Sequence, residues 1–377
     1  MSDTIGRRKF LEQTATGASG IALSSAVALA ENNASPKIKV GVITHAGGAH
    51  LGAYFDGLAK CEYVESVVVA DPDSKAGAAA KEKLGGKLNQ VYLDRRELLA
   101  TEKPEMALVS VEAKRGPAAI DDCLEAGCHV LAEKPACVRV ADFEPLVAKA
   151  AEKNLHLMLA LANRLNPEVV EAKRLVSTGQ IGKIYGVELQ LVADQTRLKS
   201  KAYQQTWFAY KSRAGGGHLS WLGIHWLDLA MFITGSKIEQ VAGFAGNVGG
   251  QPIGVEDSAA MAIHFDNGTF GTLTSGYYLD KGYHSLLKIW GSEGWLRIEF
   301  DKPRAVTWYR TGHSKSAAGE VYQATGEYVA YTEMVKAAVQ ASMGLQDAPL
   351  SGSDALTVLK AVFGLYEAAE TGKTISI

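Results

Sequence analysis

The stretch His129-Val130-Leu131-Ala132-Glu133-Lys134-Pro135 pairs a short buried-strand pattern with a Glu-Lys-Pro tripeptide. It follows a segment that itself has the pattern of strand, helix and strand. Ligands bind at the carboxyl ends of the strands in such a unit, so Lys134 is expected to point into a cleft. An amine there can hydrogen-bond a substrate hydroxyl and help to move its proton. On the tripeptide alone, a solvated loop lysine before a turn-forming proline is the simpler interpretation, and only the rest of the chain reverses it.

Size and composition describe an ordinary globular protein. The chain has 377 residues, enough for two domains and a large core, with 47% hydrophobic residues and a net charge of -2. The chain has no excess of basic residues, so nothing in its charge indicates nucleic acid as a partner. The four cysteines, Cys61, Cys123, Cys128 and Cys137, form no C-x-x-C pair. They are expected to be core thiols, and no metal site is predicted.

The N-terminus has the pattern of an export signal. Arg7 and Arg8 precede a mildly apolar run from Thr14 to Ala28, which closes with Ala28-Leu29-Ala30. This predicts a twin-arginine signal peptide over residues 1–30, recognised by the twin-arginine export machinery, and a periplasmic or otherwise exported protein. The run is too short to serve as a stable membrane anchor. The alternative is a cytosolic protein with an amphipathic N-terminal helix.

Residues 31–163 predict a Rossmann domain. A strand from Lys37 to Thr44, a helix from about Leu51 to Cys61 and a strand from Glu65 to Ala70 form a βαβ unit. Further buried strands are expected at Met106–Val111, at the stretch that carries Lys134 and at Leu155–Leu161. Strands that alternate with helices in this way predict a doubly wound parallel sheet.

The loop after the first strand has a degraded glycine fingerprint. The three glycine positions fall on Thr44, Ala46 and Ala49, with Gly47 and Gly48 between them. Small residues still allow a pyrophosphate to approach the helix N-terminus. Asp71, at the tip of the second strand, is placed to bind a ribose hydroxyl and favours NAD over NADP. The predicted cofactor-binding residues are Thr44, Ala46, Gly47, Gly48, Asp71, Glu133 and Lys134.

After Arg164 the pattern changes to an α+β domain, predicted over residues 164–350. A long alternating strand at Lys183–Ala193 precedes several strands in quick succession after Ile238, and Asp266-Asn267-Gly268 marks a hairpin turn. These features predict an open, largely antiparallel sheet. A C-terminal helix and tail are expected over residues 351–377. An open sheet with one apolar face needs a cover, so a homodimer or homotetramer is expected.

A glycine-started helix over Ala214–Asp228 carries the second candidate cluster. His218, Trp221, His225 and Asp228 are three or four residues apart, which places them on one helix face. A histidine with a carboxylate on the same face can act as an oriented general acid or base. The simpler alternatives are a core histidine bonded to backbone and a tryptophan that only packs.

The order of these motifs resembles the Gfo/Idh/MocA oxidoreductases. The Rossmann unit, Glu133-Lys134-Pro135 and the later GG-x-L-x-x-x-G-x-H-x-x-D helix match that family over essentially the whole mature chain. The resemblance implies an NAD(P)-binding domain and a carbohydrate substrate. It also implies that Lys134 and His225 are the catalytic residues, and His218, Trp221, Asp228 and Arg164 are predicted to bind the substrate.

One departure from that family stands out. Many members have an aspartate four residues before the histidine, where this chain has Trp221. The change removes one proton-handling group, and an aromatic ring there can stack on a sugar face.

Three functions remain open. The first is an exported oxidoreductase that transfers hydride between a sugar or polyol and a nicotinamide cofactor, with Lys134 bonded to the reacting oxygen and His225 moving its proton. The periplasm offers little free NAD, so the cofactor is expected to be retained. The second is redox-neutral glycoside cleavage by oxidation, elimination and re-reduction, with His218 as a spare base. The third is a non-catalytic periplasmic sugar-binding protein.

Overall fold

The computed structural model describes residues 36–279, 281–300, 304–325, 328 and 330–377. The chain divides into two units, Met1–Pro36 and Lys37–Ile377. The predicted signal peptide, residues 1–30, lies outside the described residues. No helix in the described ranges is both long and apolar enough to span a membrane.

The first sheet is a six-stranded parallel sheet, which confirms the predicted Rossmann architecture. Its strands lie in the order β3-β2-β1-β4-β5-β6, and every neighbouring pair is parallel. The central strands are runs of Val, Ile, Leu and Ala that are buried on both faces, as a parallel sheet between helices requires. The strands are β1 (Ile38–Thr44), β2 (Val64–Ala70), β3 (Leu88–Tyr92), β4 (Met106–Ser110), β5 (His129–Ala132) and β6 (Leu157–Leu159).

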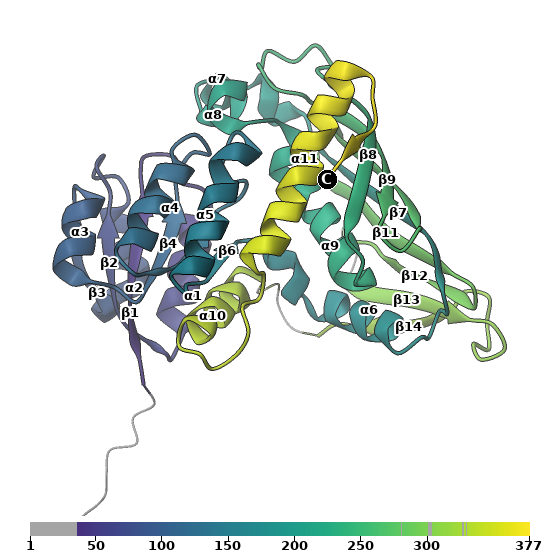
Figure 1. Cartoon of the computed structure of the whole chain (residues 1–377), viewed down its shortest axis with the longest axis horizontal. Coiled ribbons are helices and arrows are strands. Elements are labelled where there is room, and N and C mark those ends of the chain that lie inside the picture. The colour runs from purple at the N-terminus through teal and green to yellow at the C-terminus, as the bar shows by residue number, and fades with distance from the viewer. Residues whose placement is uncertain (1–35, 280, 301–303, 326–327, 329) are drawn as a thin grey trace, which may run out of the picture. The chain divides into compact units, whose positions relative to one another are not determined.

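Helices cover this sheet (Figure 1). They are α1 (Leu51–Lys60), α2 (Gly77–Leu84), α3 (Arg95–Glu102), α4 (Gly116–Glu125) and α5 (Val140–Glu152), with a short 3-10 turn, η1 (Gly85–Lys87). A later helix, α10 (Ala330–Ser342), also packs here, although it falls within the range predicted for the second domain. A Cβ at Gly57 of α1 would lie 3.0 Å from the Cβ of Val335 of α10, so the absent side chain lets the two helices approach.

The second sheet has nine strands in the order β14-β13-β12-β11-β7-β10-β9-β8-β15. Among the described strands of this second sheet, only β7 and β10 pair in parallel, which confirms the prediction of a largely antiparallel sheet. The predicted turn before Gly268, whose φ is +81°, connects β9 to β10. The strands are β7 (Ile184–Asp194), β8 (Ile238–Gly246), β9 (Ser258–Phe265), β10 (Phe270–Leu279), β11 (Tyr283–Gly291), β12 (Gly294–Ile298), β13 (Ala305–Arg310), β14 (Glu320–Gln323) and β15 (Ile375–Ser376).

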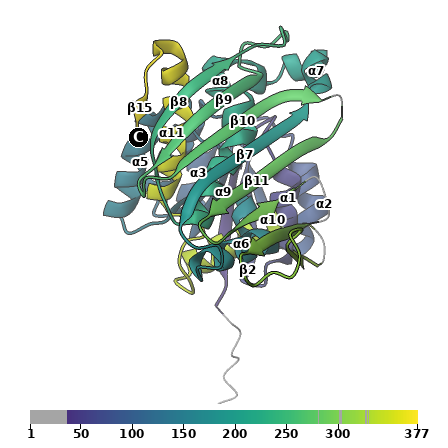
Figure 2. The ribbon, with the colours of Figure 1, turned by 90° about the vertical axis from the view of Figure 1, so that its right-hand side faces the viewer.

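Helices α6 (Pro167–Ser177), α9 (Ile224–Thr234) and α11 (Gly352–Thr371) lie on one face of this sheet, and Figure 2 shows the other face turned to the viewer. The sheet exposes large apolar side chains such as Phe244 and Phe270. They are consistent with a covered face in an oligomer, which stays a prediction.

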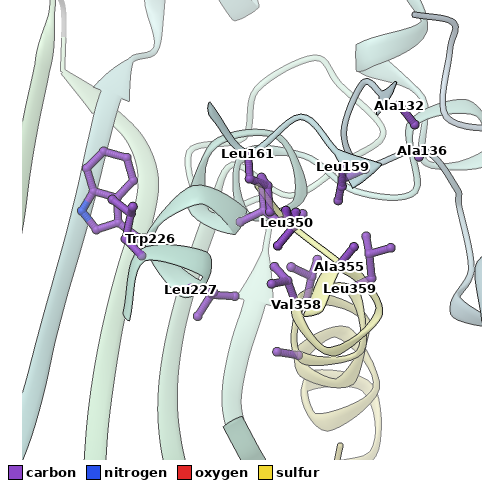
Figure 3. Packing of buried hydrophobic residues seen from close by; sticks show 14 of the residues in the cluster. Ala132, Ala136, Leu159, Leu161, Trp226, Leu227, Leu350, Ala355, Val358 and Leu359 are labelled. Carbon is purple, nitrogen blue, oxygen red and sulfur yellow. The ribbon is translucent and has the colours of Figure 1, made fainter. Parts of the chain in front are cut away.

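One continuous core joins the two sheets. Figure 3 shows Val358 and Leu359 of α11 in the same cluster as Leu159 and Leu161, at the end of the Rossmann sheet, and Leu227 of α9. Short elements connect the domains and surround the site: η2 (Ala162–Leu165), η3 (Thr196–Lys199), α7 (Lys201–Gln204), η4 (Trp207–Ala209), α8 (Lys211–Ala214) and the π-helical turn η5 (Leu219–Gly223). This shared core fixes the carboxyl edge of the Rossmann sheet against the second domain.

Candidate active site

Lys134 follows β5 and is buried against the second domain. Its side chain is 1% exposed, and its Nζ donates a hydrogen bond of 2.6 Å to the carbonyl oxygen of Trp221. The same Nζ lies 3.2 Å from the centroid of the Trp221 ring, a cation–π contact. Burial lowers the pKa of Lys134 from 10.5 to about 8, opposed by the neighbouring charge of Glu133. The ammonium therefore loses its proton more readily than that of an exposed lysine.

Glu133 is equally buried and has two different oxygens. Oε2 accepts hydrogen bonds from the Tyr54 hydroxyl and from His50 Nδ1, the latter at 3.1 Å. Oε1 lies 3.8 Å from Lys134 Nζ and has no hydrogen-bond partner among the described residues. Glu133 was predicted to bind a cofactor, and the structure places it as the bridge between Lys134 and His50.

An aromatic wall surrounds Lys134. The His50 ring stacks with Trp221 at a centroid distance of 5.7 Å and with Tyr331 of α10 at 4.7 Å. The rings of Trp207 and Phe208 contact Trp221 edge to face. His50, Tyr331 and Phe208 are absent from the sequence-based predictions, because their approach to Lys134 depends on tertiary packing.

The glycines before η5 are required by close packing. A Cβ at Gly216 would clash with the Tyr366 hydroxyl, and a Cβ at Gly217 would clash with the Glu256 carbonyl. The buried carboxylate of Glu256 accepts hydrogen bonds from the N–H groups of Gly217 (2.6 Å) and Leu219 (3.0 Å). These bonds satisfy the orphan donors at the start of the helical segment. The π-helical turn follows, a feature often found at functional sites.

His225 comes directly after this turn. It is buried, and its Nδ1 has no hydrogen-bond partner in the described part of the chain. Burial, with the charges of Lys134 and His50, lowers its pKa well below the ordinary histidine value. His225 is therefore a neutral imidazole with a free ring nitrogen near Lys134.

The His218 side chain contacts the second sheet, whereas Trp221 contacts Lys134. Its Nδ1 lies 2.6 Å from Ser275 Oγ of β10, and its ring packs edge-on against Tyr277. Burial lowers its pKa to about 3, with the charge of Arg197 adding to the effect. The prediction that His218 shares one α-helical face with Trp221 assumed a regular α-helix, and the π-helical turn interrupts that spacing.

Arg164 and Asp228 form a closed ion pair. Arg164 donates to both carboxylate oxygens of Asp228, at 3.0 and 2.5 Å, and to the carbonyl oxygen of Pro349 at 3.0 Å. Burial raises the pKa of Asp228, and Arg164 opposes that rise. The mutual hydrogen bonds favour a structural link between η2 and α9 over the predicted contact with a substrate.

The loop after β1 is tight despite its degraded fingerprint. Thr44, at the first glycine position, donates through Oγ1 to the Ser110 carbonyl at 2.9 Å. A Cβ at Gly48 would clash with Thr44 Oγ1 and would approach the Ser110 oxygen at 2.7 Å. Gly47 has a φ of +93°, a conformation that favours glycine. The two glycines therefore supply the turn that the standard fingerprint supplies elsewhere.

Asp71 is engaged by its own turn. Its buried carboxylate accepts hydrogen bonds from the N–H groups of Asp73, Lys75 and Ala76. Asp73, two residues later, accepts a hydrogen bond of 2.8 Å from the Ala46 N–H of the loop. Asp73 is thus the carboxylate that reaches the predicted pyrophosphate loop, and it is absent from the sequence-based predictions, which named only Asp71.

Residues 207–213 of the second domain contact the same edge of the Rossmann sheet. Trp207 Nε1 donates to the Gly47 carbonyl at 3.0 Å. Arg213 pairs with the buried carboxylate of Glu112, and its carbonyl accepts from the Lys114 N–H at 3.0 Å. Residues 207–213 thus attach the second domain to the loop after β1 and to the segment after β4.

The residues at this edge fit a bound dinucleotide. Strand order reverses between β1 and β4, which is the position where such sheets bind ligands. Gly47 and Gly48 lie just before the N-terminus of α1, and unpartnered buried atoms of Glu133 and His225 flank Lys134. Asp73 and Trp207 border this loop, because they bond to the Ala46 N–H and to the Gly47 carbonyl.

Known proteins share both halves of the chain. Residues 38–161 match the family described as oxidoreductase family, NAD-binding Rossmann fold. Residues 169–297 match the GFO/IDH/MocA C-terminal domain.

Myo-inositol 2-dehydrogenase from Thermotoga maritima is 26% identical over 230 residues, which span 60% of this chain and 65% of that relative, just under two thirds. D-apiose dehydrogenase from Paraburkholderia graminis is 23% identical over 344 residues, 87% of this chain and 86% of that relative. Levoglucosan dehydrogenase, solved in complex with NADH, has a TM-score of 0.80 at 18% identity and covers 90% of this chain and 99% of its own. This last likeness concerns the fold.

Proposed function

Because the chain belongs to the Gfo/Idh/MocA family of oxidoreductases, we propose that it is an NAD(P)-dependent dehydrogenase acting on a CH–OH group of a sugar or polyol derivative. The observation that carries the proposal is the buried Lys134 ammonium at the end of β5, with a pKa of about 8 and His225 nearby. The names of the relatives that act on myo-inositol and D-apiose support the substrate class.

The electrostatics divide the work between Lys134 and His225. A bound nicotinamide would accept the hydride from the substrate carbon. Lys134, with a pKa near working pH, is suited to take the hydroxyl proton in oxidation and to return it in reduction. His225 holds a proton poorly because its pKa is low, so it is suited to orient the hydroxyl as a neutral hydrogen-bonding group. This assignment exchanges the roles predicted for these two residues from the sequence.

The proposal extends to an exported enzyme that keeps its cofactor. The twin-arginine pattern of residues 1–30 supports export, since that pathway carries folded proteins. The hydrogen bond from Trp207 to Gly47 and the ion pair of Arg213 with Glu112 support retention, because they hold the second domain against the segments that follow β1 and β4. NAD is favoured over NADP, because the acidic Asp71 and Asp73 would repel a ribose phosphate.

One experiment tests cofactor and activity together. Purified mature protein is denatured, and the released small molecules are identified by mass spectrometry; native protein is then mixed with panels of sugars and polyols while nicotinamide fluorescence is followed. Released NAD and a substrate-dependent change in fluorescence are expected. Absence of bound cofactor, of binding on titration and of any fluorescence change would contradict the proposal and favour a sugar-binding protein.

Glycoside cleavage gains no support from the geometry of His218. That reaction needs a second base, and the buried His218, with a pKa of about 3, accepts a proton poorly. The fluorescence screen includes glycosides, because release of an aglycone without net reduction would identify the cleavage reaction.

A further inference from the structure

Glu133 connects two groups that otherwise do not meet. Its Oε2 accepts from His50 Nδ1 at 3.1 Å, and its unpartnered Oε1 lies 3.8 Å from Lys134 Nζ. A buried carboxylate oxygen without a donor is costly, so a free acceptor beside an ammonium is a feature that calls for a function. Rotation of the ammonium away from the Trp221 carbonyl would bring a proton to Oε1.

Exposure increases along this row of side chains. Lys134 and Glu133 are each 1% exposed, whereas His50 is 33% exposed. A lysine that accepts a proton at each oxidation must lose it before the next turnover. The buried Lys134 ammonium has no exposure sufficient for direct exchange with water, and His50 provides contact with solvent.

We propose that Glu133 and His50 carry protons between Lys134 and solvent, with His50 as the proton-transfer residue that acts through Glu133. The proposal rests on the proposed dehydrogenase function. In oxidation a bound nicotinamide would take the hydride, and Lys134 takes the hydroxyl proton of the substrate. Lys134 passes one proton to Glu133 Oε1, and the carboxylic acid turns to present that proton to His50. His50, which exchange with solvent has converted to the Nε2–H tautomer, accepts the proton at Nδ1, and the imidazolium gives its Nε2 proton to solvent, which restores the Nδ1–H tautomer beside Glu133. In reduction the same transfers run in reverse.

The other groups around His50 keep their protons through this cycle. Burial raises the pKa of Tyr54 on α1 and of Tyr331 on α10 well above the ordinary tyrosine value. Trp221 stacks on His50 and does not titrate, and the charge of His50 lowers the pKa of the neutral His225. The hydrogen-bonded groups left to carry a proton between Lys134 and solvent are therefore Glu133 and His50.

The first test compares His50→Gln with His264→Gln. His264, on strand β9 of the second sheet, is a matched control. Its side chain is 32% exposed and pairs with Glu239 at 3.3 Å. Stopped-flow measurements in weak buffer follow nicotinamide fluorescence and proton release with a pH indicator. We expect His50→Gln to slow turnover by roughly ten- to hundredfold, with recovery on addition of imidazole, while the control keeps wild-type rates. Unchanged turnover in His50→Gln, or a loss that imidazole does not restore, would overturn the proposal.

A second test needs no substrate. The pH titration of Lys134 is followed by NMR of protein labelled with 13C at the lysine Cε, in wild type, His50→Gln and His264→Gln, with Lys134→Arg to assign the signal. Loss of His50 removes a donor from Glu133 and leaves more of its negative charge to Lys134, so the titration midpoint of Lys134 should move to higher pH. An unmoved midpoint would show that Glu133 does not couple the two groups. A protein that turns over no substrate but shows the shifted midpoint would remove the dehydrogenase function and keep the coupling.

Discussion

Two buried ion pairs lie near the junction of the two domains, and they differ in how completely they are bonded. Arg164 and Asp228 are closed, with hydrogen bonds to both carboxylate oxygens and to the Pro349 carbonyl. Lys134 and Glu133 are open, at 3.8 Å with Oε1 unpartnered. A buried charge pair offsets its desolvation only when its hydrogen bonds are complete. The closed pair is therefore suited to hold the fold, and the open pair to exchange a proton.

The largest effect is expected from removing the ammonium of the open pair. Lys134→Ala should lower kcat by about 10²–10⁴-fold, the range for loss of a positioned acid or base, with the fold retained. Steady-state kinetics and bound-cofactor analysis measure the two effects. Lys173→Ala is the control, since Lys173 Nζ also lies over an aromatic ring, at 3.9 Å from the Phe232 centroid. Turnover that survives in Lys134→Ala would remove Lys134 from the mechanism.

Breaking the closed pair should act on stability. Arg164→Ala leaves the buried Asp228 carboxylate without its partner, and a loss of about 3–5 kcal/mol in the free energy of unfolding is expected. Urea denaturation followed by fluorescence measures it. Arg139→Ala breaks an exposed pair with Asp142 as the comparison and should cost under about 1 kcal/mol. Equal losses in both variants would contradict the structural role of Arg164.

The architecture and the position of Lys134 after a buried strand were predictable from the sequence because their signals are local, whereas its catalytic role stays a prediction. Buried Val and Ile runs define the strands of the Rossmann sheet, and Lys134 directly follows one of them. The contacts that shape the site are not local. Trp207 bonds to Gly47 across 160 residues, and His50 meets Glu133 across 83. No spacing rule could have found either contact.

Two sequence-based assignments left out hydrogen bonds that these segments make in the fold. The prediction that His218, Trp221, His225 and Asp228 share one helix face assumed a regular α-helix. Instead η5 is a π-helical turn, and His218 contacts Ser275 while Trp221 contacts Lys134. Asp71 was assigned from its place at the strand tip, but backbone N–H groups of the following turn occupy its carboxylate. Both outcomes follow from hydrogen bonds of the backbone, which residue types alone do not reveal.

A smaller effect is expected from replacing Trp221, whose ring lies against the Lys134 ammonium. Trp221→Asp replaces the indole beneath the Lys134 ammonium with a carboxylate, which should raise the pKa of Lys134 above about 8. Oxidation requires the unprotonated amine, so its rate rises with pH through that pKa, and the midpoint of the profile should move to higher pH. The profile of kcat in the oxidative direction measures the shift. Trp221→Asn separates the loss of the ring from the added charge, and a midpoint that moves equally in both variants would contradict the electrostatic explanation.

The smallest effect is expected on cofactor release, from removing the hydrogen bond between Trp207 and the loop after β1. Trp207→Phe keeps an aromatic ring but removes the hydrogen bond from Nε1 to the Gly47 carbonyl. A single hydrogen bond contributes about 0.5–1.5 kcal/mol, so cofactor release should become roughly 2- to 13-fold faster if this contact holds the loop. Displacement of bound cofactor by excess labelled cofactor gives the rate. Phe208→Leu, which alters the neighbouring ring without touching Gly47, is the control. Release that is unchanged in Trp207→Phe would contradict a role of this hydrogen bond in retention, which would then depend on the Arg213–Glu112 pair or on the dinucleotide contacts themselves.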